Sequence, residues 1–209
     1  PRAERLRDVI RLPILGGHYG RMLEAGEIDR ARTDAEMTVR YYDHELPVAP
    51  RSLRPLLMEA AHRSGSDDLA FIADSYDRMA PAATADAEEV EQRYRDMTVL
   101  RRQLARLFDE KPYVAGALDE VVAETNRDPE RLGALLDDQH YRLAYWRTGG
   151  RELGYRRFFD VDTMAALRSE DDEVFTATHA LALRLVEEAC VDGLRIDHID
   201  GLGRPAEYL

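Results

Sequence analysis

The residues with the clearest chemical potential lie near the C-terminal end of the chain, in the sequence VDGLRIDHIDGL at 191–202. Gly193 follows a helical pattern over about 173–190, and the residues after it are short and apolar and end in ionisable groups. This order predicts a helix, a break and a buried strand. Because side chains alternate along a strand, we expect Arg195 and Asp197 on the same face.

An arginine beside a carboxylate changes the chemistry of that carboxylate. A guanidinium within about 4 to 6 Å typically lowers the pKa of a carboxyl by about 1 to 3 pH units, so Asp197 is predicted to be ionised at neutral pH. An ionised, oriented carboxylate is what a glycosidase with a covalent intermediate requires of its nucleophile. A structural ion pair between Arg195 and Asp197 would explain the same spacing. Spacing alone does not decide between the two.

His198 follows Asp197 directly, which suits either a hydrogen-bonded structural role or a substrate contact. The other five histidines show no metal-ligand spacing. The chain also has no H-E-x-x-H, no G-x-S-x-G and no phosphate-binding glycine loop. The sequence therefore predicts no metal site and no cofactor.

The stretch 141–159 is unusually rich in aromatic residues and arginines. Aromatic rings stack on the apolar faces of sugars while arginines donate hydrogen bonds to hydroxyls, so the stretch predicts a sugar-binding wall. A buried aromatic core is the alternative for each single ring. The residues concerned are Tyr141, Tyr145, Trp146, Arg147, Tyr155, Arg156, Arg157, Phe158 and Phe159.

The elements that must position these residues fall into three segments, 1–51, 52–139 and 140–209. The first is expected to hold the end of a helix over 2–10, a glycine-rich loop over 13–20 and a hairpin. The hairpin strands are predicted at 26–32 and 37–42, since the second segment is rich in residues that favour strands. The last segment returns to the candidate strand.

The middle segment, 52–139, is predicted to be an all-helical block. Its longest helical pattern runs over 84–108, with an apolar stripe of Val90, Tyr94, Met97, Leu100, Leu104 and Leu107 at spacings of three and four. Further helices are predicted over 52–65 and 66–79 with Ser52 and Ser66 as N-caps, after Pro112, and from Asp128-Pro129 to about 139.

Composition limits the class of protein. With 209 residues and 44% hydrophobic content, the chain is long enough to fold around one sizeable core or two small ones. Its net charge of −12 disfavours nucleic-acid and anionic-membrane partners. No apolar run approaches the roughly 20 residues of a membrane span, which favours a cytoplasmic protein. The single cysteine, Cys190, cannot form an internal disulfide and is expected in the core.

The block 145–209 resembles the maltooligosyltrehalose synthases, a branch of the α-amylase superfamily. The sequence GLRIDH at 193–198 resembles the fourth-strand motif of that superfamily. YRRFFDVD at 155–162 and DGL at 200–202 narrow the resemblance to this branch. Two earlier stretches are also similar to the family: LPILGGHYG at 12–20 and RYYDHELPVAPRS at 40–52.

The chain departs from the family pattern at three positions. Gly154 stands where asparagine is expected, Ile199 where proline is usual, and Arg204 where an acidic residue commonly precedes Pro205. These departures put in doubt the local substrate contacts around Gly154 and Arg204 and leave the assignment of Asp197 unaffected.

The resemblance implies a fold and a set of site residues. The implied fold is mainly α with a few strands, part of a (β/α)8 barrel enzyme that carries a large all-helical insertion over 52–139. Asp197 is implied as the catalytic nucleophile. The residues implied to bind substrate are Arg195, His198, Trp146, Tyr155 and Arg156.

The implied activity belongs to the whole enzyme, of which this chain would be a fragment without activity of its own. That enzyme converts the reducing-end α-1,4 bond of a maltooligosaccharide to an α,α-1,1 bond by a retaining mechanism, as a step of trehalose biosynthesis. A maltooligosyltrehalose trehalohydrolase is its implied functional partner. Two alternatives remain open: another α-amylase-superfamily hydrolase, and a non-catalytic helical interaction module.

Overall fold

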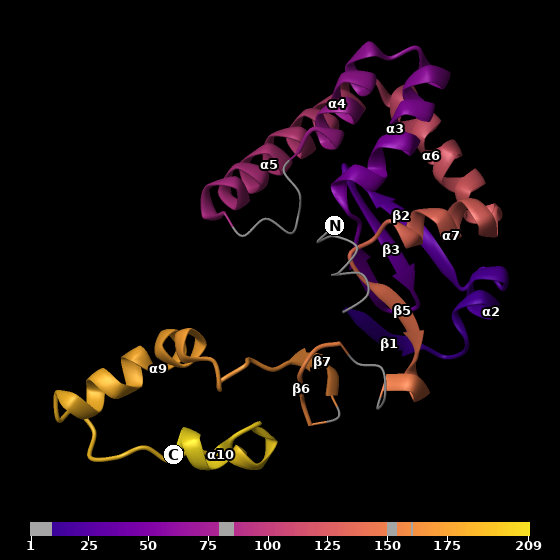
Figure 1. The fold of residues 1–209 in the computed structure, drawn as a ribbon. Coiled ribbons are helices and arrows are strands. Elements are labelled where there is room, and N and C mark those ends of the chain that lie inside the picture. The colour runs from indigo at the N-terminus through magenta and orange to yellow at the C-terminus, as the bar shows by residue number, and fades with distance from the viewer. Residues whose placement is uncertain (1–9, 80–85, 150–153, 160) are drawn as a thin grey trace. The chain divides into compact units, whose positions relative to one another are not determined.

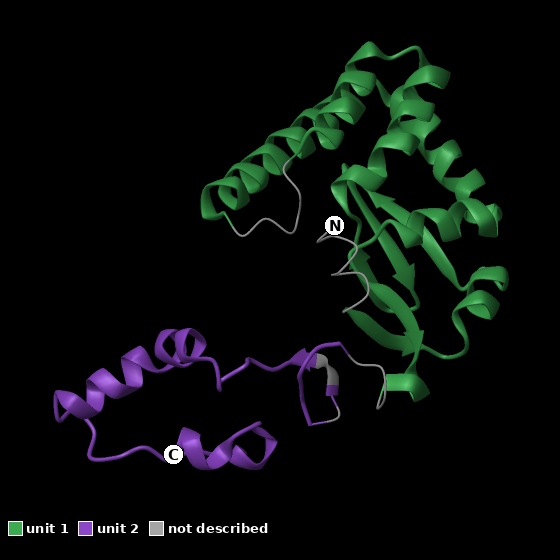
Figure 2. Cartoon of the chain, in the orientation of Figure 1, with its two compact units in different colours: residues 1–153 green, residues 154–209 purple. Residues whose placement is uncertain are grey.

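The computed structural model describes residues 10–79, 86–149, 154–159 and 161–209, which form two compact units, 1–153 and 154–209 (Figures 1 and 2). The described residues are mainly helical and carry three small sheets, as the sequence predicts. The helix end expected over 2–10 lies almost entirely outside the described residues. The division into 1–51, 52–139 and 140–209 stays a prediction.

Unit 1 contains two sheets. In the first, β1 (Arg11–Leu15) pairs in parallel with β5 (Arg142–Tyr145). In the second, β2 (Ile28–Thr33), β3 (Glu36–Tyr41) and β4 (His44–Pro47) are antiparallel in that order. The short helix α2 (Tyr19–Glu24) follows β1.

The predicted hairpin is confirmed, because β2 and β3 pair in full register. The loop expected over 13–20 is wrong in its first part, since Pro13 and Leu15 are buried in β1. The physical reason is long-range: the segment becomes a strand because β5 supplies its ladder partner from far along the chain. No local feature of the sequence around 11–15 indicates that β5 will pair with it.

The helical block forms five helices: α3 (Pro50–Ser64), α4 (Asp67–Asp77), α5 (Ala87–Glu110), α6 (Pro112–Arg127) and α7 (Pro129–Asp137). The cap at Ser66 is confirmed, since its hydroxyl accepts from Leu69 N–H. Asp128 likewise accepts from the first turn of α7.

The cap predicted at Ser52 is wrong. Helix α3 begins two residues earlier, because the fixed backbone angle of Pro50 suits the first turn. The Ser52 hydroxyl instead donates to the carbonyl of Ala49 at 2.7 Å.

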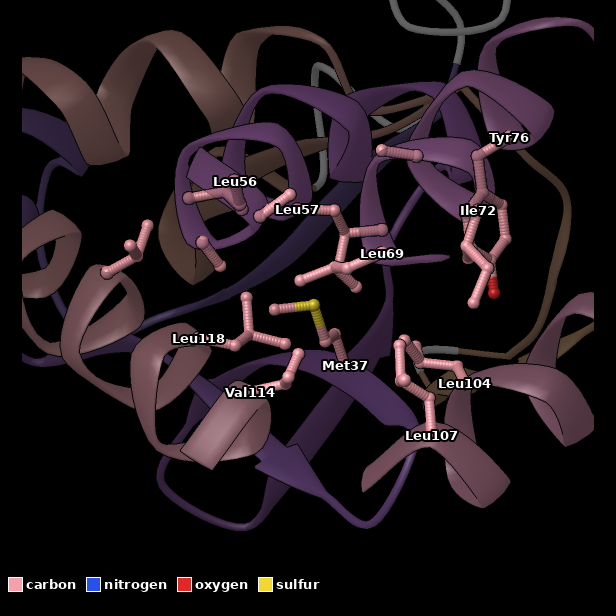
Figure 3. Close-up of a cluster of buried hydrophobic side chains, with 14 of the residues drawn as sticks. Met37, Leu56, Leu57, Leu69, Ile72, Tyr76, Leu104, Leu107, Val114 and Leu118 are labelled. Atoms are coloured by element: carbon pink, nitrogen blue, oxygen red, sulfur yellow. The ribbon is translucent and has the colours of Figure 1, made fainter. Parts of the chain in front are cut away.

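Two hydrophobic clusters hold unit 1 together. The larger one lies among the helices and takes in Met37 from β3 (Figure 3). The smaller one packs the strands against α7, whose Leu132 and Leu136 are buried. The apolar stripe predicted on α5 is buried only in its second half: Leu100, Leu104 and Leu107 are buried, whereas the Tyr94 ring is 60% exposed. Periodicity marks a face of a helix but does not tell how much of it meets a partner.

Side-chain amides tie the helices to the strands. The Asn126 amide of α6 accepts from the backbone N–H of Arg30 at 2.9 Å and donates to its carbonyl at 3.0 Å. The buried Gln139 accepts from Ala49 N–H at 2.7 Å and donates to Leu135 O and to the Ser52 hydroxyl. Strands and helices of unit 1 are therefore one cooperative structure.

Unit 2 is built differently. It holds the hairpin of β6 (Arg157–Phe158) and β7 (Val161–Ala165), the helix α9 (Asp172–Glu187), the 3-10 turn η2 (Ile199–Gly201) and the short α10 (Pro205–Tyr208). None of the unit 2 residues for which burial is described, 154–159, 161 and 164–209, is buried. The expectation that Cys190 lies in a core is therefore wrong, because the helix end that carries it is exposed.

An ion pair joins two distant segments of unit 2. Both terminal nitrogens of Arg156 contact the Glu170 carboxylate at 2.5 Å, across 14 positions. The Arg156 hydrogen bonds, helped by a backbone N–H, hold the pKa of Glu170 down at about 2. Because the folded pKa is lowered, the pair stabilises unit 2 above the ordinary carboxyl pKa, and that contribution is lost as the pH falls toward 2.

One buried group in unit 1 is poorly satisfied. Arg30 is only 2% exposed, and its Nη2 meets the Met37 sulfur at 3.8 Å. Its Nε and Nη1 have no hydrogen-bond partner among the described residues. Burial lowers the pKa of this guanidinium to about 10, so it remains a desolvated cation at neutral pH.

We expect Arg30→Met to stabilise the 209-residue chain by about 1–3 kcal/mol, because an apolar side chain of similar length replaces a desolvated cation. Urea unfolding measures the change. Arg32→Met is the matched control on the same strand: Arg32 pairs with Asp119 at 2.6 Å and should give no such gain. A destabilised Arg30→Met variant would contradict this account.

We also expect the Glu170 side chain to titrate near pH 2, and to return toward the ordinary carboxyl range in Arg156→Gln, because its chief hydrogen-bond donor is then lost. A pH titration of the carboxyl resonance by NMR measures both. An unchanged Glu170 titration in Arg156→Gln would rule out the pair as the cause.

Candidate active site

The segment that carries the candidate nucleophile is not a strand. Residues 193–198 pair with no other strand among the described residues, and the turn η2 follows them. Leu194 is 47% exposed and Ile196 is 39% exposed, so the predicted buried strand is wrong for the chain as described. A strand needs a neighbour to satisfy its backbone N–H and C=O groups, and no described segment supplies one here.

The expected contact between Arg195 and Asp197 is absent as well. Both residues are described, and no ion pair joins them. Without strand geometry, the alternation that would place the two side chains on one face does not apply. The Asp197 side chain is 71% exposed and so is open to a substrate. Its role as nucleophile stays a prediction.

Asp197 has a different neighbour, His198. The backbone N–H of His198 donates to Asp197 Oδ1 at 3.1 Å, and His198 Nε2 lies 3.5 Å from Oδ2. The His198 backbone is left-handed, with φ 56° and ψ 36°. This conformation is uncommon outside glycine and is several-fold enriched in histidine. It turns the imidazole back toward the carboxylate that precedes it.

Two aromatic rings hold the imidazole in place. Phe158 and Phe159 lie with their ring centroids 5.5 and 4.9 Å from that of His198, both nearly perpendicular to it. The two phenylalanines also contact each other edge to face at 4.5 Å. Such edge-to-face contacts are a favoured arrangement of aromatic rings. The hairpin of β6 and β7 therefore orients the group beside Asp197.

Of the remaining candidates, Arg156 lies in unit 2 but is engaged by Glu170. Tyr155 precedes it and is half-buried, and Arg195 is exposed. Trp146 belongs to unit 1, where its ring is 54% exposed and the Arg147 guanidinium lies 5.1 Å from its centroid. The substrate-binding roles of these residues remain predictions.

Two features of unit 2 were not anticipated from the sequence. The first is the pairing of Arg156 with Glu170. The second is a cavity of about 220 Å³ whose lining includes Glu170, Arg204 and Glu207. Arg204 pairs with Glu207 at 2.8 Å. The only sequence signal for this cavity was the departure from the family pattern at Arg204.

Across residues 10–79, 86–149, 154–159 and 161–209, no group of three or more His, Cys, Asp or Glu side chains is placed to hold a metal ion. Within the same ranges, no helix combines the length and apolar character that crossing a bilayer requires.

The geometry of unit 2 suits nucleophilic chemistry at one carboxylate. Asp197 is open to solvent on most of its surface, and its orientation is fixed by the N–H of the next residue. An imidazole held by two rings stands beside it. Retaining glycoside transfer also needs a second carboxyl roughly 5 to 5.5 Å away to protonate the leaving oxygen.

Comparison with known proteins shows which proteins the chain is similar to. No family model matches the chain. Two curated proteins named as maltooligosyl trehalose synthases, from two strains of Mycobacterium tuberculosis, are each 53% identical to it over 76 residues. That match covers 36% of this chain and 10% of each relative, so the chain corresponds to a small part of them.

Two solved structures also match. A glycosyltrehalose synthase is 27% identical with a TM-score of 0.46, over 97% of this chain and 18% of that one. A mutant maltooligosyltrehalose synthase from Arthrobacter ramosus is 26% identical with a TM-score of 0.44, over 100% of this chain and 16% of that one. On the identity to the curated relatives, the chain is a homologue of one segment of maltooligosyltrehalose synthase.

Proposed function

We propose that the protein containing this segment converts the reducing-end α-1,4 bond of a maltooligosaccharide to an α,α-1,1 bond. The observation that carries the proposal is the 53% identity over 76 residues to proteins named as maltooligosyl trehalose synthases. We propose equally that the segment belongs to a (β/α)8 barrel, in which neighbouring strands would complete the ladder at 194–197.

Asp197 is the nucleophile in this proposal. Its carboxylate attacks the anomeric carbon of the reducing-end glucosyl bond, and a second carboxyl, from a part of the enzyme outside this chain, protonates the leaving glucose. That glucose then attacks through its own anomeric hydroxyl and displaces Asp197, while the second carboxyl, now ionised, takes back the hydroxyl proton. The two displacements retain the anomeric configuration.

The neighbours of Asp197 keep it ready for attack. The His198 N–H orients Oδ1, and the His198 imidazole, which packs against both Phe158 and Phe159, lies near Oδ2. An imidazole at this position can also donate to a hydroxyl of the bound glucosyl ring. The two phenylalanines contribute apolar surface beside the covalent intermediate, and the rest of the enzyme would have to complete its shielding from water.

The other candidates take supporting roles. Arg195 is exposed and carries five N–H donors that can meet sugar hydroxyls. Trp146 offers an open ring for stacking on a sugar face, and Tyr155 offers a phenolic hydroxyl. Arg156 acts through Glu170, because both of its terminal nitrogens are committed to that carboxylate.

Transfer and hydrolysis differ in which acceptor reaches the intermediate. The proposed transferase returns the leaving glucose, whereas a related hydrolase with the same nucleophile admits water and releases glucose. Product analysis of the full-length protein with maltopentaose separates them. A non-reducing oligosaccharide supports the proposal, and released glucose as the main product contradicts it. No turnover and no sugar binding would favour a non-catalytic module.

We expect Asp197→Asn in the full-length protein to lower kcat by about 10³-fold or more while sugar binding is largely kept, because an amide preserves shape but removes the charge. Single-turnover assays and a maltooligosaccharide titration measure the two effects. Asp192→Asn, an exposed aspartate five positions earlier, is the matched control and should retain activity. An Asp197→Asn variant with a tenth or more of wild-type kcat would disprove the assignment.

The 209-residue chain by itself should catalyse neither transfer nor hydrolysis. Losing general acid catalysis alone typically removes a factor of about 10² to 10⁴ in rate, and the exposed Asp197 also has no shield from water here. Incubation with maltopentaose, followed by chromatography of the sugars, checks this. Turnover that Asp197→Asn abolishes would show that the chain supplies its own acid.

A further inference from the structure

Unit 1 contains a cavity of about 440 Å³ beside the parallel pair β1 and β5. Its volume lies within the range of about 300 to 1,000 Å³ that is usual for small-molecule sites. The cavity is lined by residues of 11–19 and of 136–148, among them His18, Asp137, Tyr141 and Tyr145. These two parts of the sequence lie far apart along the chain, so only the folded unit forms the cavity.

The cavity has an apolar floor and a polar rim. Leu136, Tyr141 and Leu143 are buried and belong to the smaller hydrophobic cluster. The Tyr141 hydroxyl donates to Pro47 O at 3.0 Å, which fixes this ring in the floor. His18 and Asp137 are exposed at the rim. A ligand here would rest on a rigid surface and meet polar groups at its edges.

Two rings form one wall. The His18 and Tyr145 centroids are 5.2 Å apart, with the planes inclined at 55°. The Thr148 hydroxyl donates to the Tyr145 carbonyl at 2.8 Å and fixes the backbone that carries this ring. Aromatic side chains of this kind offer large, rigid apolar faces with polar tips. The C–H face of a pyranose ring is a matching surface.

The charges around the cavity fit a neutral polyhydroxylated ligand. Arg11 and Arg142 occupy paired positions of β1 and β5 and supply N–H donors. Asp137 lines the same cavity and supplies a carboxylate acceptor. Sugar hydroxyls both donate and accept, so they can use both kinds of group. A phosphate or carboxylate ligand would be repelled by Asp137 but attracted by the two guanidiniums, so an anion is the competing ligand for this cavity.

We infer that this cavity binds a glucosyl unit of an α-1,4-glucan, with the ring against His18 and Tyr145 and the hydroxyls toward the arginines and Asp137. The inference rests on the proposed function for the identity of the sugar. It assigns binding to His18, which lies in the stretch LPILGGHYG at 12–20.

The 209-residue chain is titrated with maltotriose and, separately, with inorganic phosphate, while the backbone amides are followed by NMR. We expect saturable shifts at the cavity residues with maltotriose. His18→Ala should weaken binding about three- to tenfold, the usual effect of losing one aromatic contact. Asp137→Asn should weaken it as well, since a charged acceptor is replaced. His62→Ala, at an exposed histidine on α3 outside the cavity, is the matched control and should bind as wild type does.

The absence of maltotriose-dependent shifts in the cavity would overturn the inference, as would unchanged affinity in both His18→Ala and Asp137→Asn. Phosphate binding in the same place, without maltotriose binding, would also overturn it and mark an anion site. Failure of the proposed function is seen separately, in the products of the full-length protein. If the chain binds maltotriose but the full-length protein makes no non-reducing product, this binding site is supported and the proposed function is contradicted.

Discussion

Unit 1 depends on the parallel pairing of β1 with β5, which sets Arg11 beside Arg142. Two parallel strands cannot be joined by a tight turn, so the chain between them must leave the sheet and return. Among the described residues, that crossover includes a second sheet and six helices, α2 to α7, and it packs back on the strands. The burial of Leu132 and Leu136 against the strands and the amide of Asn126 on β2 show how the helices are held there. The cavity beside the pair is a product of this closure.

Unit 2 has no comparable constraint. None of its residues for which burial is described is buried, so little hydrophobic free energy holds its segments together. Specific polar and aromatic contacts hold the segments together instead. Arg156 pairs with Glu170, and the Phe175 ring stacks on His179. His179 Nε2 in turn lies 2.6 Å from the Tyr208 hydroxyl. Contacts of this kind are individually weak when exposed. Large apolar side chains of unit 2, among them Leu181 and Ile196, are exposed and do not contribute to a core.

What the sequence predicted correctly is local. Ser66 and Asp128 cap their helices because a short polar side chain reaches the first-turn N–H groups within three residues, a rule that needs no tertiary information. The hairpin of β2 and β3 follows from strand-forming residues on either side of a short turn. The errors concern partners far along the chain. The local sequence of β1 predicts a loop, because nothing near it indicates that β5 will pair with it. The strand expected at 194–197 has no described neighbour with which to form a ladder.

The same distinction explains the candidate site. Sequence could select Asp197 and His198 as chemically capable, and could mark Phe158 and Phe159 as part of an aromatic wall. The predicted contact between Asp197 and Arg195 depended on the alternation of side chains along a strand. In unit 2 the left-handed backbone at His198 instead turns the imidazole to the carboxylate and toward the two rings. Formation of a barrel strand at 194–197 would restore the alternation and bring Arg195 to the same face as Asp197. The surroundings of Asp197 therefore depend on whether neighbouring strands pair with residues 194–197, and not on the motif alone.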